Sequence, residues 1–128
     1  FFFFFFFEQL LKYPDWISVW IELMDISETI ADQLKENKIL LYMKGSPNLP
    51  QCGFSAKTVQ ALMSCGEKFA YVDVLSNPEI RKHLPKIANW PTFPQLWVEG
   101  ELIGGCDIVL EMHASGELEP LIKDATAS

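Results

Sequence analysis

Runs of apolar residues separated by polar turns predict an alternation of strands and helices along this chain. Residues 38–43 (Lys-Ile-Leu-Leu-Tyr-Met) are too apolar to alternate, so they predict a central strand buried on both faces. Residues 69–74 predict a second strand. The segment between them forms one helical stripe, made of Phe54, Thr58, Ala61, Leu62 and Cys65. A strand–helix–strand unit of this length predicts parallel pairing of the strands through a right-handed crossover.

Further helices are expected before and after this unit. One is predicted from the four-residue spacing of Ile26, Ile30 and Leu34. Asp25 or Ser27 can cap that helix at its N-terminus. Near the C-terminus, Asp107 is expected to cap a helix that Gly116 interrupts and that residues 117–125 extend.

The segment between these helices carries its own helix and turn signals. Asn77-Pro78 predicts the start of a short helix that breaks at Pro85. Glu99-Gly100 predicts a two-residue hairpin turn between strands at 95–98 and 101–104. The order of elements predicts an α/β chain with a thioredoxin-like fold, in which helices flank a four-stranded mixed sheet. A chain of 128 residues that is 49% hydrophobic can bury one such core, so residues 24–128 are expected to form one domain.

Residues 1–23 do not fit this pattern. Seven consecutive phenylalanines open the chain, without the basic region of a signal peptide or the arginines of a mitochondrial presequence. Glu8, Lys12, Pro14 and Asp15 interrupt the roughly 20 apolar residues that a transmembrane helix needs. We therefore expect an extra, non-native or disordered extension before a natural start at Met24. The alternative is a membrane or partner anchor.

Charge and cysteine content narrow the function classes. A net charge of −7 argues against a nucleic-acid partner, because nucleic-acid binding normally needs a basic face. Three cysteines, an odd number without paired short spacings, do not make a disulfide framework. They predict a reducing compartment, which we take to be the cytoplasm, and no membrane association is expected.

Cys52 is the candidate reactive residue. It lies between a loop at residues 45–51 and the first turn of the predicted helix. The unpaired N–H groups and the positive dipole end of a helix N-terminus favour a thiolate over a thiol, and Lys44 can add a positive charge. Three positions on, Ser55 stands where a dithiol motif has its second cysteine, so Cys52 has no local partner for a disulfide. The alternative is a buried structural cysteine.

Four motifs in order resemble one known family. They are Met43-Lys44-Gly45-Ser46-Pro47, the segment 49–55 (Leu-Pro-Gln-Cys-Gly-Phe-Ser), the segment 89–95 (Asn-Trp-Pro-Thr-Phe-Pro-Gln) and Gly104-Gly105-Cys106-Asp107. Together they look like a monothiol glutaredoxin of the single-domain, CGFS type, as found in bacteria. The likeness runs from about Met24 to the C-terminus.

The resemblance implies a set of glutathione-binding residues around Cys52. It implies a cis peptide bond before Pro94 and backbone pairing of glutathione beside it. It also implies that the turn at residues 104–107 holds the γ-glutamyl end and that Arg81, assisted by Lys86, meets the glycine carboxylate. The full implied set is Lys44, Arg81, Lys86, Thr92, Phe93, Pro94, Gly105, Cys106 and Asp107.

From the residues alone, other interpretations without a bound ligand stay open for the same positions. Pro94 is then a strand-entry proline, Asp107 a plain helix cap and Arg81 a surface cation. Cys106 can instead be a second redox partner for Cys52. His83 and His113 have no metal-ligand spacing with each other or with the cysteines, so both are expected to face solvent.

Two functions fit these residues. The resemblance implies that Cys52 ligates a labile 2Fe-2S cluster, bridged between two subunits and two glutathiones in a homodimer. It also implies transfer of the cluster to iron–sulfur acceptor proteins and a BolA-like partner. The alternative is a glutathione-dependent thiol–disulfide oxidoreductase that removes glutathione from mixed disulfides. The longer loop at residues 45–51 favours the cluster carrier by resemblance, and any enzymatic activity is expected to be weak.

Overall fold

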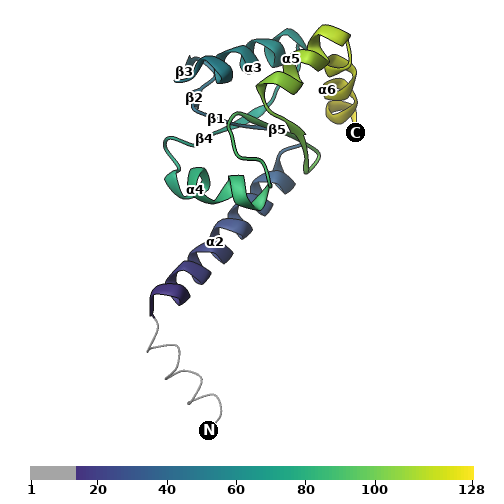
Figure 1. Cartoon of the computed structure of the whole chain (residues 1–128). Helices are drawn as coiled ribbons and strands as arrows, with labels where there is room; N and C mark the ends of the chain where they lie inside the picture. Colours follow the sequence, from purple (N-terminus) through teal and green to yellow (C-terminus); the bar gives the residue numbers. More distant parts are fainter. Residues whose placement is uncertain (1–13) are drawn as a thin grey trace.

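A four-stranded mixed sheet forms the centre of the protein (Figure 1). The structure is a computed structural model that describes residues 14–128, so the prediction for residues 1–13 lies outside the described part. The strands are β1 (Ile39–Met43), β4 (Ala70–Asp73), β5 (Gln95–Val98) and β6 (Glu101–Gly104), in the spatial order β4-β1-β5-β6. β1 pairs with β4 in parallel and with β5 antiparallel, and β6 pairs antiparallel with β5. This is the predicted thioredoxin-like sheet.

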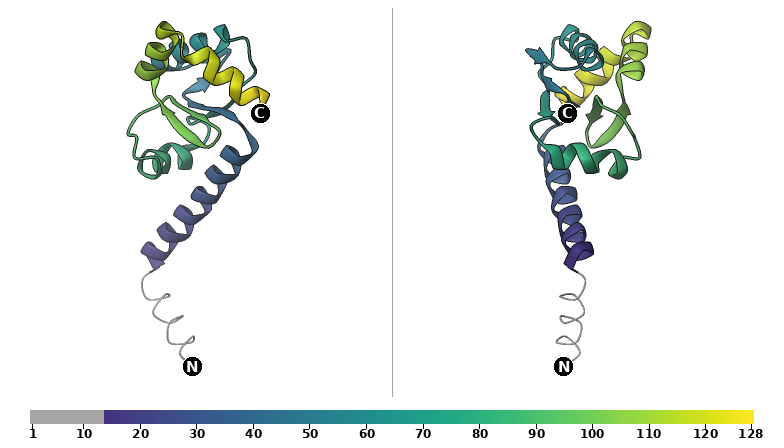
Figure 2. Two further views of the ribbon diagram at one scale, coloured as in Figure 1. Left: turned by 90° about the vertical axis from the view of Figure 1, so that its right-hand side faces the viewer. Right: turned by 60° about the vertical axis from the view of Figure 1, so that its left-hand side comes forward.

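Helices cover both faces of the sheet, as Figure 2 shows from two sides. One face packs against α3 (Gly53–Ser64), α5 (Cys106–Ser115) and α6 (Leu118–Ala127). The other packs against α2 (Pro14–Glu36) and α4 (Pro78–Ile87). The two faces share β1, whose side chains alternate between the two hydrophobic clusters and are all buried. The predicted burial of this strand on both faces is therefore confirmed.

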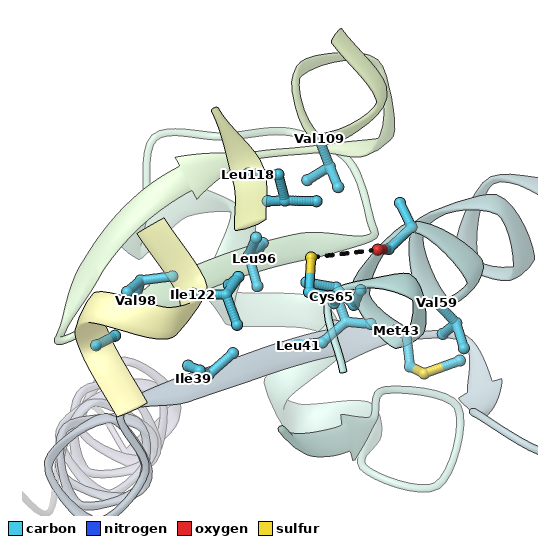
Figure 3. Close-up of a cluster of buried hydrophobic side chains, with 13 residues drawn as sticks. Ile39, Leu41, Met43, Val59, Cys65, Leu96, Val98, Val109, Leu118 and Ile122 are labelled. Atoms are coloured by element: carbon cyan, nitrogen blue, oxygen red, sulfur yellow. Dashed lines mark hydrogen bonds between the residues drawn. The ribbon is translucent and has the colours of Figure 1, made fainter. Parts of the chain in front are cut away.

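Cys65 lies within the first of these clusters (Figure 3). Its side chain is 3% exposed and packs among apolar residues that include Leu41, Leu96 and Leu118. The thiol donates to the carbonyl oxygen of Ala61 at 3.5 Å. Burial raises the pKa of the Cys65 thiol above its ordinary value. Cys65 is thus a structural cysteine, as its place on the helical stripe predicts. Phe54 was predicted on the same stripe but is 59% exposed.

The first helix starts earlier than predicted. The sequence predicted a cap at Asp25 or Ser27, but α2 begins at Pro14 and runs through Met24 without a break. Residues 15–36 contain neither glycine nor proline, so nothing in them stops a helix from extending. Only the second half of α2 reaches the core, through Ile26, Ile30 and Leu34, whereas its first half is largely exposed. Within residues 14–128, no helix combines the length and hydropathy needed to cross a bilayer.

Three other local predictions need correction. α4 does not break at Pro85 but continues to Ile87, and the backbone N–H of Ala88 still donates to the carbonyl oxygen of Leu84. α5 is capped by Gly105, which places Asp107 in the first turn rather than at the cap. The loop at residues 45–51 contains a small hairpin of β2 (Gly45–Ser46) and β3 (Leu49–Pro50).

The predicted hairpin turn and C-terminal helix are confirmed. Glu99 and Gly100 both have positive φ values, 51° and 79°, as a two-residue turn between β5 and β6 requires. Gly116 ends α5 in the left-handed conformation with a φ of 82°, and α6 follows directly after it.

Candidate functional site

Cys52 occupies the N-cap position of α3. Its backbone is extended, with φ −152° and ψ 136°, and its side chain is partly exposed. The chain enters this position from the β2–β3 hairpin, so the thiol lies where a turn meets the first backbone N–H groups of a helix. Cys52 is therefore not the buried structural cysteine of the alternative interpretation.

The helix N-terminus lowers the pKa of the Cys52 thiol below its ordinary value. The backbone N–H of Ser55 makes the largest contribution, and the N–H of Phe54, the charge of Lys44 and the Ser55 hydroxyl add to it. Partial burial acts in the opposite direction. No cap hydrogen bond of ordinary geometry reaches the sulfur, so these groups act as nearby donors that favour the thiolate.

Ser55 has a structural partner in Lys44, directly after the end of β1. Its side chain is fully buried, and its hydroxyl oxygen accepts a hydrogen bond from the backbone N–H of Lys44 at 3.2 Å. The hydroxyl that replaces a second thiol therefore joins α3 to the end of β1. It also keeps Lys44 at the helix start that carries Cys52.

Asp73 holds the loop that precedes Cys52. Its Oδ1 accepts hydrogen bonds from the N–H groups of Gly45 and Leu75, each at 2.9 Å. A Cβ at Gly45 would lie 2.6 Å from the carbonyl oxygen of Leu49, and its φ of +89° also requires glycine. Partial burial works against ionisation of Asp73, but these N–H donors and Ser76 lower its pKa overall.

A cavity of about 720 Å³ opens beside Cys52, within the size range of small-molecule sites. Every residue predicted for the site lines this cavity except Lys86, which is exposed on α4. The remaining lining residues are Phe54, Pro85, Trp90, Pro91 and Ile108. Sequence reasoning did not assign these five to the site. In a sequence, apolar side chains of this kind are equally typical of core and surface positions, so they do not indicate a site.

The segment before β5 forms one wall of the cavity. The Phe93–Pro94 peptide bond is cis, as the resemblance implied. Gln95 is fully buried, and its Nε2 donates to the carbonyl oxygens of Trp90 at 3.1 Å and Thr92 at 3.2 Å. The sequence predicts no structural role for this glutamine. The only signal for one is a polar residue at the start of an otherwise apolar strand.

Gly105 allows the opposite wall to come close to this segment. A Cβ at Gly105 would lie 3.2 Å from the carbonyl oxygen of Pro94 and 3.3 Å from Nε1 of Trp90. That indole nitrogen is buried and has no hydrogen-bond partner within residues 14–128. Gly105 is also the N-cap residue of α5, so the free N–H groups of a second helix N-terminus lie on the Gly105 side of the cavity.

The charges of the lining residues suit a zwitterionic, peptide-like ligand. Lys44 and Arg81 are cationic, Asp107 is anionic, and aromatic and proline side chains make up much of the rest. Cations and helix N-termini bind carboxylates, and a carboxylate can receive an ammonium group. Cys106 lines the same cavity but is only 7% exposed.

Of the two histidine predictions, one is confirmed and one is wrong. His113 is exposed, as expected. His83 is 5% exposed and lies against Glu22 and Glu79, so the prediction that it faces solvent is wrong. The sequence could not show this contact, because Glu22 lies 57 residues before Glu79 and meets it only through helix packing.

The fold and the activated thiol define a thioredoxin-like thiol protein, and comparisons with known proteins specify its family. The glutaredoxin family profile matches residues 39–103. The chain is 70% identical over 100 residues to Glutaredoxin 4 of Escherichia coli (strain K12), covering 78% of this chain and 87% of that relative. It is 63% identical over 101 residues to Glutaredoxin 4 of Haemophilus ducreyi, covering 79% and 94%.

Solved structures agree with this result. The solution structure of reduced poplar apo GrxS14 matches with a TM-score of 0.69 and 42% sequence identity. That match covers 80% of this chain and 94% of the poplar chain. The chain belongs to the glutaredoxin family, which uses glutathione.

Proposed function

We propose that this chain is a monothiol glutaredoxin that binds glutathione and carries a labile 2Fe-2S cluster between two subunits. Its role is then iron–sulfur cluster assembly and transfer. The observation that carries the proposal is the state of the three cysteines. Cys52 is partly exposed beside a cavity, whereas Cys65 and Cys106 are 3% and 7% exposed.

Ligand count supports a shared cluster. A 2Fe-2S cluster takes four thiolates, and one chain offers one accessible thiol. Ser55, at the position of a second motif cysteine, is fully buried and hydrogen-bonded to Lys44. Two chains supply two thiolates, so two glutathione thiolates complete the set.

The cavity supports glutathione as the companion ligand. In this proposal, Arg81 and Lys44 bind the glycine carboxylate, and Gly105 and Cys106 offer backbone N–H groups to the γ-glutamyl carboxylate. Asp107 faces the α-ammonium group. Thr92, Phe93 and Pro94 present backbone to the cysteinyl part, which brings its sulfur beside Cys52. Lys86 lies outside the lining and is left with an indirect role.

The proposal extends to partners and location. The cluster is the cargo, which the dimer passes to iron–sulfur acceptor proteins, and a BolA-like protein can replace one subunit. Exposed Leu49 and Phe54, 67% and 59% exposed, flank Cys52 in the chain and suit contact with such a partner. Unpaired cysteines suit a reducing compartment, so we propose the cytoplasm.

The lowered pKa of Cys52 favours a second candidate function, glutathione-dependent thiol–disulfide exchange. The Cys52 thiolate would attack the glutathione sulfur of a mixed disulfide, and the substrate sulfur would leave as a thiolate. A second glutathione thiolate would then attack the Cys52–glutathione disulfide. That step releases oxidised glutathione and restores the Cys52 thiolate.

Anaerobic reconstitution of the full chain with iron, sulfide and glutathione tests the carrier proposal. We expect a coloured dimer with one 2Fe-2S centre per two chains, and a colourless monomer when every low-molecular-weight thiol is left out. Cys52→Ser should abolish the colour, whereas Cys65→Ser is the matched control that keeps it.

Three outcomes would contradict the carrier proposal or its ligand assignment. A cluster held by a single chain, or formed without any added thiol, contradicts the ligand count. Loss of the cluster in Cys65→Ser alone contradicts the ligand assignment. Rapid turnover of a glutathione mixed disulfide by a chain that never takes up iron supports the oxidoreductase instead.

A further inference from the structure

Three potential metal ligands meet where α2 packs against α4, outside the cavity at Cys52. Nε2 of His83 lies 3.8 Å from Oε1 of Glu22 and 4.0 Å from Oε2 of Glu79. One donor atom from each of the three residues falls within 4.8 Å of the others. None of the three lines the cavity at Cys52, so this cluster is a separate feature.

His83 is the residue that makes the cluster unusual. Its side chain is 7% exposed, and Nε2 has no hydrogen-bond partner within residues 14–128. Both carboxylate oxygens lie beyond hydrogen-bond distance of this nitrogen. A buried imidazole nitrogen without a partner is unfavourable, because it has lost its water without gaining a replacement.

The two carboxylates also lie close together, with donor oxygens within 4.8 Å of each other. A side-chain hydrogen bond with Glu22 raises the pKa of Glu79, and the same contact lowers the pKa of Glu22. Lys82 and His83 both act on the two carboxylates and favour their ionised forms. A divalent cation between the two carboxylates would offset the repulsion between their negative charges.

The spacing of the donors is close to that of a metal site. Tetrahedral zinc with bonds of about 2.0–2.2 Å places its ligand atoms roughly 3.3–3.6 Å apart. The separations of 3.8 and 4.0 Å exceed this by less than 1 Å, within reach of small side-chain rotations. Glu79 and His83 are four residues apart on α4, so one helix face presents both.

We propose that Glu22, Glu79 and His83 bind a divalent transition-metal ion of the zinc class and thereby join α2 to α4. One imidazole and two carboxylates are ligands that zinc accepts, and three protein ligands leave one position for water. A hollow of about 470 Å³, lined in part by Ser18, Asp25, Glu22 and Glu79, adjoins the cluster and can hold that water.

Metal binding by the full chain with Cys52→Ser tests this site, because that background removes the thiolate that would compete for zinc. Calorimetry with Zn²⁺ should show one site per chain. Absorption spectra with Co²⁺ should show metal binding without a thiolate-to-metal band. Zn²⁺ should also raise the melting temperature, since it binds only the folded chain.

Single substitutions in this background identify the ligands. Glu22→Gln and His83→Ala should each weaken Zn²⁺ binding at least about tenfold, because a lost ligand costs no less than a lost outer-shell contact. Matched controls are Glu28→Gln, an exposed carboxylate further along α2, and His113→Ala, an exposed histidine. Both controls should bind Zn²⁺ unchanged.

Glu22→Gln decides the question if His83→Ala fails to fold, because Glu22 is on a partly exposed helix face and leaves the buried imidazole in place. The proposal is overturned if the folded parent binds no Zn²⁺. It is also overturned if Glu22→Gln binds as tightly as its parent. In either case Glu22, Glu79 and His83 do not form a metal site.

Discussion

The hydroxyl of Ser55 accepts a hydrogen bond from the backbone N–H of Lys44 across the junction of β1 and α3. The same hydroxyl helps to lower the pKa of the Cys52 thiol. One buried side chain therefore positions the cation next to the thiol and tunes the thiol itself. A serine at this place does more than remove a second cysteine.

Ser55→Ala should lower the free energy of unfolding by about 1 kcal/mol, because the Lys44 N–H loses its acceptor in a partly buried place. It should also raise the pKa of Cys52, since one of the groups that favour the thiolate is gone. Chemical denaturation and the pH dependence of Cys52 alkylation measure the two effects. Ser64→Ala, near the exposed end of the same helix, is the control and should leave the alkylation profile in place. An unchanged profile in Ser55→Ala would remove Ser55 from this role.

Lys44→Gln should move the alkylation midpoint of Cys52 to higher pH, because a positive charge that favours the thiolate is lost. The shift should shrink at high salt, which screens the charge.

The folded-state pKa of Cys52 lies below its ordinary value. Ionisation of Cys52 therefore stabilises the fold above that ordinary value, and the contribution disappears as pH falls through the folded-state pKa.

The control for this substitution is Lys57→Gln, which removes an exposed lysine from α3, the helix that follows Cys52, without affecting the cavity lining. An equal shift in both variants would mean that general charge, and not the position of Lys44, sets the pKa.

Features fixed by local chemistry could be predicted from the sequence. The continuous apolar run of β1 predicts its burial, and the Glu99-Gly100 turn predicts the hairpin. The position of Cys52 before a helix predicts which N–H groups surround it, since those groups belong to the next few residues. The resemblance supplied the residues that the cavity brings together, which come from segments far apart in the chain.

Features that depend on packing between distant segments could not be predicted. His83 is buried because α2 crosses α4, and the sequence of neither helix predicts that contact. Gln95 is buried because its amide finds two carbonyl oxygens in the preceding turn. The start of α2 was misplaced because the family likeness ends near Met24, whereas the helix-forming residues do not.

Deletion of residues 1–23 tests whether residues 24–128 are a complete domain, as we propose. The α2 side chains in the core, Ile26, Ile30 and Leu34, all remain. Exposed residues such as Trp16 and Trp20 are lost, together with the Glu22 contact to His83. The melting temperature should fall by no more than about 5 °C, and glutathione affinity should stay the same. A much larger fall, or loss of glutathione binding, would show that the first half of α2 belongs to the domain.

Arg81 is the only arginine of the chain and lines the cavity from α4, whereas its neighbour Lys82 does not. Arg81→Ala should weaken glutathione binding roughly 10- to 100-fold, the equivalent of a charge-assisted hydrogen bond of about 1.5–3 kcal/mol, without unfolding the protein. Calorimetry measures the affinity, with Lys82→Ala as the matched control for loss of a cation on the same helix. Lys86→Ala should have a much smaller effect, because Lys86 is outside the lining. If Arg81→Ala and Lys82→Ala bind glutathione equally well, the ligand carboxylate does not meet Arg81 and the proposed orientation of glutathione is wrong.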